Sequence, residues 1–259
     1  MGRLSKIGRI FYGIAMVGIG FQIIYYHDFP YWLLPPKHSW IPGLIMIAYI
    51  FGIMFVLTGA CIVFEKKTRP TSLLTGTLLL LVFCFYFIPY QFMASSRYMH
   101  LLQWENAEKE LAFCSGAFVI AGCHSETNEK TFYQSLGKLL LFGSILFSIP
   151  IISFGILHFL HAKDVADYVP SWVPNRLFWA YLAGTALIGS GLAIILKIKA
   201  GLAATLLGIM IFIWFIVLHV PRVIASPVAY LGSEITSAFI ALAYSGIAFV
   251  IAGASKKTA

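Results

Sequence analysis

Long apolar runs are the feature of this chain that most constrains its fold. Eight of them occur, at roughly residues 10–26, 42–64, 71–89, 110–123, 138–160, 176–196, 200–220 and 233–253. Most reach the ~20 residues that a helix needs to cross a ~30 Å hydrocarbon layer. Backbone polar groups in lipid must be satisfied internally, and no alternating strand pattern is present, so each run is predicted to be a helix. The sequence therefore predicts an all-α membrane protein with eight transmembrane helices.

The overall composition agrees with a membrane location. Of the 259 residues, 11% are charged and 60% are hydrophobic. A soluble domain carries about 25% charged residues because it needs a hydrated surface. So few charges cannot cover a globule of this length in water, whereas a lipid-facing surface needs none. The lipid bilayer is thus the first partner that the sequence predicts.

The basic residues predict the orientation of the chain rather than a nucleic-acid site. The net charge is +8, but the basic residues stand in short clusters between apolar runs. If the N-terminus is cytoplasmic, the inner segments hold 12 Lys and Arg residues and the outer segments hold 6. This asymmetry is typical of the positive-inside rule. We therefore expect a protein of the cytoplasmic (inner) membrane with both termini cytoplasmic, and no nucleic-acid partner.

An internal repeat relates the two halves of the chain. A shift of 132 residues places positions 39–89 on 171–221 without a gap, and 13 of those 51 positions are identical. The matches include Trp, Pro, Gly and Lys residues, which apolar composition alone does not explain. A shift of 131 also places the sequence F-V-I-A-G at 118–122 on the same letters at 249–253.

The repeat predicts the domain organisation. Residues 1–123 form a first four-helix transmembrane unit, 124–137 a polar cytoplasmic linker, and 138–259 a second four-helix unit. Because each unit has an even number of helices, the two units start on the same side of the membrane. The repeats are therefore expected to be parallel, related by an axis along the membrane normal.

Three short motifs in the second unit carry a family resemblance. Gly155–Phe159 reads G-I-L-H-F, Val169–Pro174 reads V-P-S-W-V-P, and His219–Arg222 reads H-V-P-R. With these motifs the chain resembles the DoxX/DoxD-like membrane family, best over residues 138–253 and more weakly over 10–123. The resemblance implies four-helix bundles, some linked to quinone-reducing thiosulfate oxidation or to membrane redox complexes, and many without an assigned activity.

The same comparison places any family site in the second unit. The first unit has Phe87 at the position of His219 and Tyr90 at the position of Arg222. His158 and His219 end two helices that run in the same direction, so their imidazoles should share one depth near the outer surface. Arg222 follows within one turn. A polar cluster at such a depth normally faces protein or a cavity.

The candidate ligand-binding residues are therefore His158, His219, Arg222 and Asp167. Asp167, or alternatively Asp164, is the expected internal partner of Arg222, because a buried Arg without a partner is costly. The cluster fits a quinone headgroup, a metal or haem held by two histidines, or an anionic substrate. In the structural alternative, each His only caps or bridges helix ends near water. No catalytic residue and no metal site is assigned.

These observations lead to two main hypotheses. The first is an integral membrane component of a redox system, with a membrane redox partner, that binds quinone or a similar small ligand between helices five to eight; haem is the less favoured cofactor. The alternative is a small-molecule transporter or carrier, suggested by the repeat, or a non-catalytic scaffold subunit. Glu108 and Glu110 are expected to lie at the outer edge of the fourth helix. The sequence therefore predicts no Asp or Glu at mid-depth, which counts against an ion-coupled transporter.

Overall fold

The computed structural model describes residues 2–35, 42–94, 100–123 and 140–255. These residues are predominantly helical, and no strand occurs among them. In chain order the elements are α1 (Arg3–Tyr26), α2 (Leu44–Val63), α3 (Thr68–Val82), the π-helical turn η1 (Phe83–Phe87), α4 (Ile88–Ala94), the 3-10 turn η2 (Leu101–Trp104), α5 (Glu105–Gly122), α7 (Leu140–Leu160), α8 (Ala162–Tyr168), α9 (Arg176–Ile195), α10 (Ala200–Trp214), the π-helical turn η4 (Phe215–His219), α11 (Val220–Ala225), the 3-10 turn η5 (Ala229–Leu231) and α12 (Ser233–Ser255). The linker predicted at 124–137 lies outside the described residues.

Within the described ranges, seven helices are long and apolar enough to cross a membrane. They are α1, α2, the continuous helix Thr68–Met93, Gly143–Leu160 of α7, α9, the continuous helix Ala200–Ala225, and α12. At a rise of 1.5 Å per residue, even the shortest is about 27 Å long. These apolar helices indicate an integral membrane protein that sits in a lipid bilayer. The remaining long helix, α5, is different, because four of its first six residues are charged.

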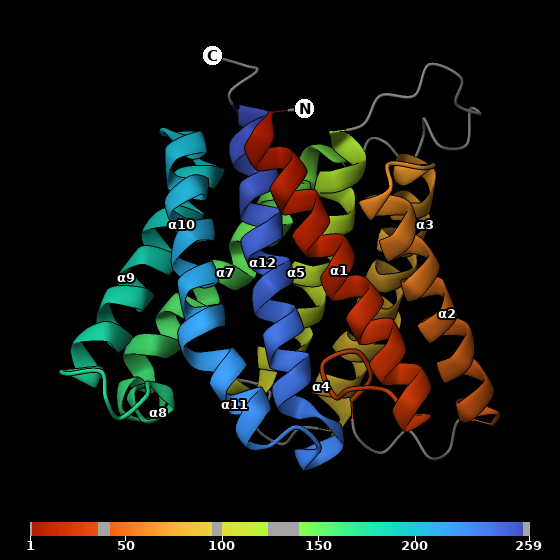
Figure 1. The fold of residues 1–259 in the computed structure, drawn as a ribbon, viewed down its shortest axis with the longest axis horizontal. Helices are drawn as coiled ribbons and strands as arrows, with labels where there is room; N and C mark the ends of the chain where they lie inside the picture. The colour runs from red at the N-terminus through yellow and green to blue at the C-terminus, as the bar shows by residue number, and fades with distance from the viewer. Residues whose placement is uncertain (1, 36–41, 95–99, 124–139, 256–259) are drawn as a thin grey trace.

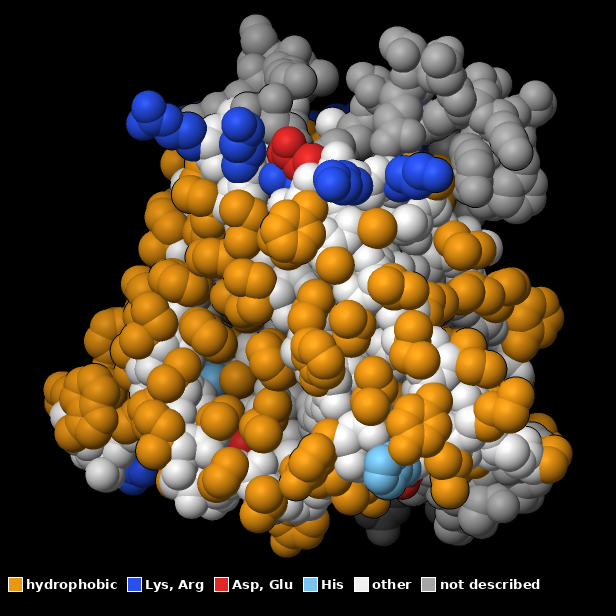
Figure 2. Space-filling view, turned by 45° about the vertical axis from the view of Figure 1, so that its right-hand side comes forward, with side chains coloured by type: hydrophobic (Ala, Val, Ile, Leu, Met, Phe, Trp, Pro, Cys, Tyr) orange, Lys and Arg blue, Asp and Glu red, His pale blue; other side chains and the backbone are white. Residues whose placement is uncertain are grey.

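The surface has the pattern that a bilayer requires. Hydrophobic side chains cover the flank of the molecule, while Lys and Arg side chains form a row at the end that carries the termini (Figure 2). Many of the large apolar side chains on the flank are exposed, among them Phe21, Leu57, Phe85 and Phe178. In water so extensive an apolar surface would cause aggregation, whereas in lipid it has no cost.

The two central helices, α5 and α12, join the halves of the chain (Figure 1). α1 packs against α2 and also against α12 from the other end of the sequence. α7 packs in the same way against α9 and against α5. α3 lies on α5, and α10 lies on α12. Each half therefore supplies a helix that packs against the first helix of the other half, so the halves interlock instead of forming separate bundles.

Several elements of the two halves have matching bounds. α2 and α9, α3 and α10, and η1 and η4 all begin and end 132 residues apart. Pro89 and Pro221 explain the two π-helical turns. A proline has no N–H, and its ring collides with the carbonyl four residues earlier, here in Phe85 and Val217. A wider π-type turn at this point relieves the collision and lets the helix continue.

Glycines let the first helix of each half approach the second closely. A Cβ atom added at Gly52 of α2 would lie 2.9 Å from the carbonyl oxygen of Gly20 in α1. A Cβ atom added at Gly184 of α9 would lie 3.1 Å from the carbonyl oxygen of Gly155 in α7. The first contact is closer than a Cβ atom tolerates, and the second would require the neighbouring backbone to shift by a few tenths of an ångström. The glycines that the sequence repeats therefore allow backbone-to-backbone helix packing, as small residues do in membrane bundles.

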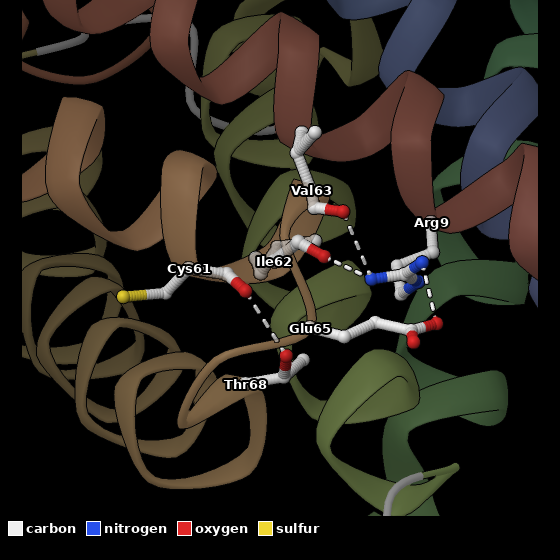
Figure 3. Close-up of polar contacts among 6 residues, drawn as sticks. All are labelled: Arg9, Cys61, Ile62, Val63, Glu65 and Thr68. Carbon is white, nitrogen blue, oxygen red and sulfur yellow. Dashed lines mark hydrogen bonds and ion pairs between the residues drawn. The ribbon is translucent and has the colours of Figure 1, made fainter.

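A buried arginine fixes the end of α2 to α1 in the first half (Figure 3). The guanidinium of Arg9 donates hydrogen bonds to the carbonyl oxygens of Ile62 and, at 3.3 Å, Val63. It also pairs with the carboxylate of Glu65 at 2.6 Å. The last carbonyls of a helix have no partner within the helix and carry partial negative charge, so a cation there is favourable. Arg9 is 4% exposed, so the arginine belongs to the core, while its partner Glu65 is half-exposed.

Candidate functional site

A cavity of about 600 Å³ lies in the second half of the molecule. Its walls come from α7, α8, α9, α10, η4 and α12, with η2 and the start of α5 closing one side. One of these lining helices, α8, lies at the end of the bundle opposite the termini (Figure 1). Most of the lining is apolar or aromatic. The polar groups among the lining residues are His158, His161, Asp164, His219, Glu105, Lys109, Ser237 and the ring hydroxyls of Tyr168 and Tyr244.

His158 is held in one orientation by its own helix. It lies in the last turn of α7, and its Nδ1 is 2.7 Å from the carbonyl oxygen of Phe154. Because a carbonyl can only accept, Nδ1 carries the proton and donates it. In the neutral imidazole Nε2 is then a free acceptor. Gly184 makes room for this residue, since a Cβ there would lie 2.9 Å from the His158 Cβ.

His219 reaches the same cavity from the π-helical turn η4. Its Nδ1 is buried and has no hydrogen-bond partner among the described residues. A buried polar atom left in this state is costly, on the order of 1–3 kcal/mol. The structure thus brings His158 and His219 to one cavity, where His158 offers an oriented acceptor, while Nδ1 of His219 is covered by protein atoms.

Arg222 lies outside the cavity lining, and its partner differs from the predicted one. Its guanidinium donates two parallel hydrogen bonds to Glu234, from Nε to Oε2 at 2.8 Å and from a terminal nitrogen to Oε1 at 2.5 Å. It also lies 4.6 Å above the ring centre of Tyr168, a cavity residue. Arg222 therefore packs against Tyr168 of the cavity wall without lining the cavity itself. Because Glu234 neutralises its charge, Arg222 would bind an anion only weakly.

The two predicted aspartate partners are used elsewhere. Asp167 is exposed and lies 4.0 Å from Arg176, while Asp164 lies 3.5 Å from the Nδ1 of His161. The prediction that either aspartate pairs with Arg222 is wrong. The reason is the packing of α11 against α12, which puts the guanidinium of Arg222 within reach of Glu234 in the first turn of α12, while its contact with α8 is the ring of Tyr168. Glu234 opens that turn, a position that favours an acid.

Aromatic residues that no motif pointed to complete the cavity. Trp179 and Trp214 both line it and contact each other edge to face, with ring centres 6.2 Å apart. Tyr244 of α12 lies against Phe147 and Phe154 of α7 and donates its hydroxyl to the carbonyl oxygen of Lys109. All three lie inside apolar runs, where an aromatic residue gives no sequence signal beyond hydrophobicity.

The prediction that no acidic residue lies at mid-depth is wrong. Tyr244 is the central residue of α12, and its hydrogen bond places Lys109 level with the middle of that helix. Ser153, near the middle of the span Gly143–Leu160, donates to Glu108 at 2.5 Å. The first turns of α5 therefore lie inside the bundle. Apolar periodicity could not reveal this, because protein rather than lipid surrounds these charges.

The described residues hold no group of three or more His, Cys, Asp and Glu side chains arranged to bind a metal ion. A scan of protein-family models, a search of curated proteins and a search of solved structures each gave no match to this chain. The resemblance to DoxX/DoxD-like proteins therefore stays a prediction, and the function has to be argued from the cavity.

Proposed function

We propose that this protein is a membrane component of a redox system and binds a ligand of the quinone and quinol class in its second-half cavity. One observation supports this above all: an apolar, aromatic cavity of about 600 Å³ presents two histidines to a single ligand. Small-molecule sites are commonly apolar clefts of ~300–1,000 Å³ with a few placed polar groups. The cavity belongs to a helical membrane protein and has mostly apolar walls, which suits a lipid-soluble ligand.

The polar groups favour a ring with oxygen substituents. Nε2 of His158 can accept a hydrogen bond from a hydroxyl group, and the imidazole of His219 lines the same cavity. Trp179 and Trp214 offer flat surfaces for a planar ring, and the apolar walls suit a hydrocarbon tail. A quinol combines all three properties. Arg222 is already neutralised by Glu234, so a free anion is the poorer fit.

The experiment is a binding measurement on purified protein in lipid nanodiscs. Small molecules that co-purify are identified by mass spectrometry and absorbance, and a short-tail benzoquinone is titrated while tryptophan fluorescence is recorded. We expect quinone to co-purify and to quench the tryptophans. His158→Ala and His219→Ala should each weaken binding about tenfold, equal to ~1.4 kcal/mol, whereas the exposed control His100→Ala should not. A Soret band would point to haem, and equal binding by all three variants would refute the site.

The proposal includes an arrangement in the membrane. We propose that α5 is an eighth spanning helix, that the chain forms two parallel four-helix repeats, and that both termini are cytoplasmic in the inner membrane. Support comes from the elements whose bounds match 132 residues apart and from the row of Lys and Arg at the terminal end (Figure 2). A cysteine introduced in 161–175 should react with an impermeant reagent from outside. Reaction only from the cytoplasmic side would overturn this topology.

A proton-coupled carrier for the same kind of ligand is the second candidate. The acids at mid-depth in α5 favour it, because buried ionisable groups in membrane proteins often mark proton relays. Uptake of the ligand into proteoliposomes only when a pH gradient is imposed would support a carrier over a redox component. No contact among the described residues specifically favours a scaffold subunit.

A further inference from the structure

The first turns of α5 carry a cluster of ionisable side chains that runs from Glu105, which is 41% exposed, to the fully buried Glu110. Glu105, Glu108, Lys109 and Glu110 stand within six residues. Lys109 pairs with Glu105 at 2.5 Å, four residues before it. One oxygen of Glu108 accepts the hydrogen bond from Ser153, while its other oxygen is buried without a partner among the described residues. The cluster thus has three acids and a single base.

Glu110 is the acid of this cluster whose negative charge no neighbouring group would compensate. Its side chain is 0% exposed, and neither carboxyl oxygen has a hydrogen-bond partner in the described part of the chain. It lies within electrostatic reach of Tyr12 and Tyr244. Both phenol groups, however, donate to backbone carbonyls of α5, Tyr12 to Phe113 and Tyr244 to Lys109. They are therefore unable to donate to the Glu110 carboxyl at the same time.

A charged carboxylate in this position would be strongly disfavoured. Removing a carboxylate from water is costly unless the ion is paired and hydrogen-bonded, and otherwise the group takes up a proton. The only base in the cluster, Lys109, is already shared with Glu105. Glu110, and to a lesser extent Glu108, are therefore the groups that must hold a proton when the protein is folded in the membrane.

The cluster also adjoins the cavity. Glu105 and Lys109 line the cavity, and Glu108 lies one turn after Glu105 on the same face of α5. Glu108 therefore lies beside residues of the cavity lining. We propose that Glu108 and Glu110 are two proton-holding carboxyl groups at mid-depth in the membrane, which exchange protons with the second-half cavity. This inference does not depend on which ligand occupies the cavity.

The first test is infrared spectroscopy of the full-length protein in nanodiscs at neutral pH. We expect a carbonyl stretch from protonated carboxylic acid, which shifts in D2O. The band should be reduced by at least half in Glu110→Gln and reduced less in Glu108→Gln. Glu65→Gln, which alters a half-exposed ion pair at the other end of the bundle, should leave it unchanged. Absence of the band from the unmodified protein, or an undiminished band in Glu110→Gln, would overturn the proposal.

The second test follows the rate at which that band shifts after transfer to D2O, and it does not require a change in α5. Ala183→Phe places a large ring in the cavity, while Leu182→Phe places the same ring on the exposed side of α9. Exchange through the cavity predicts at least tenfold slower exchange in Ala183→Phe than in Leu182→Phe. Equal rates in the two variants would refute the cavity route. Since this measurement uses no quinone, its outcome is distinct from that of the ligand-binding test.

Discussion

The two halves of the molecule differ most where their helices enclose the space beside α5 and α12. In the first half, α2 presents Phe51 and Phe55 to this space, and Phe55 is fully buried. The residues 132 positions later in α9 are Ala183 and Leu187, and both line the cavity. Replacing two phenyl rings by a methyl and an isobutyl group removes enough volume to matter in a close-packed interior. Similar helices thus give a filled core on one side and a cavity on the other.

The segment after the first helix of each half increases this difference. In the first half, the chain following α1 inserts Trp32, which is 3% exposed and has its ring centre 5.1 Å from that of Phe113. In the second half, the chain following α7 forms α8, whose residues stay at the rim of the cavity. The position 131 residues after Phe113 is Tyr244, which adds a polar group to the wall. The first half is therefore built for packing and the second for binding.

The largest expected effect comes from opening a cavity in the filled half. Phe55→Ala removes a fully buried ring that stacks on Phe113 with ring centres 6.1 Å apart. We expect a loss of about 3–5 kcal/mol in the free energy of unfolding. Leu187→Ala should cost about 2 kcal/mol, the low end for such a change, because a cavity is already present beside it. Unfolding by SDS titration measures both, and equal losses would contradict the comparison.

A smaller effect on the free energy of unfolding is expected when Arg9 and Glu65 of the first half are replaced by the residue types found 132 positions later in the second half. The residues 132 positions after Arg9 and Glu65 are Leu141 and Lys197, so the capping contact of Figure 3 has no sequence counterpart. Arg9→Leu with Glu65→Lys removes the hydrogen bonds to the end of α2 and should cost about 1–3 kcal/mol in the free energy of unfolding. The matched control is Lys66→Leu, an exposed neighbour. Equal stability of the double variant and the control would show that the cap is dispensable.

The smallest expected effect on the free energy of unfolding comes from removing the partner of Arg222, Glu234, and is compared with the effect of changing Asp167. Glu234→Gln weakens a two-bond pair whose side chains are 36% and 18% exposed, and we expect a loss of about 1 kcal/mol in the free energy of unfolding. Asp167→Asn alters a contact whose side chains are 43% and 79% exposed, and should cost less than about 0.5 kcal/mol. Thermal unfolding in detergent ranks the two variants. The reverse ranking would contradict the stabilising role given to the Arg222–Glu234 pair.

Much of the fold can be predicted from the sequence, because a helix that faces lipid needs a continuous apolar run of sufficient length. The runs 176–196 and 233–253 nearly coincide with α9 (Arg176–Ile195) and α12 (Ser233–Ser255). The run 110–123 places the start of α5 too late, because buried charges inside a bundle resemble a loop in sequence. The helix in fact begins at Glu105. Hydropathy describes contact with lipid, so it fails where protein surrounds a helix.

The candidate site was predictable only in part. Helix direction and depth place His158 and His219 near each other, and the structure brings both to one cavity. The partner of Arg222 depends on the rotation of α11 about its axis, which no motif specifies. Likewise, Trp179 and Tyr244 were hidden among many aromatic residues in apolar runs. The cavity itself arises from Ala183 and Leu187, whose small size is informative only beside Phe51 and Phe55.

The most direct test of the binding role is photo-crosslinking with a photoreactive, short-tail quinone in native membranes, followed by mass spectrometry of the labelled peptides. We expect labelling in the peptides that carry His158, Trp214 and His219, and little labelling around Phe51 and Phe55. The double variant Ala183→Phe with Leu187→Phe copies the first half into the second and should reduce labelling at least tenfold, while Leu182→Phe should not. Equal labelling of the two halves, or full labelling of the double variant, would contradict a ligand site in this cavity.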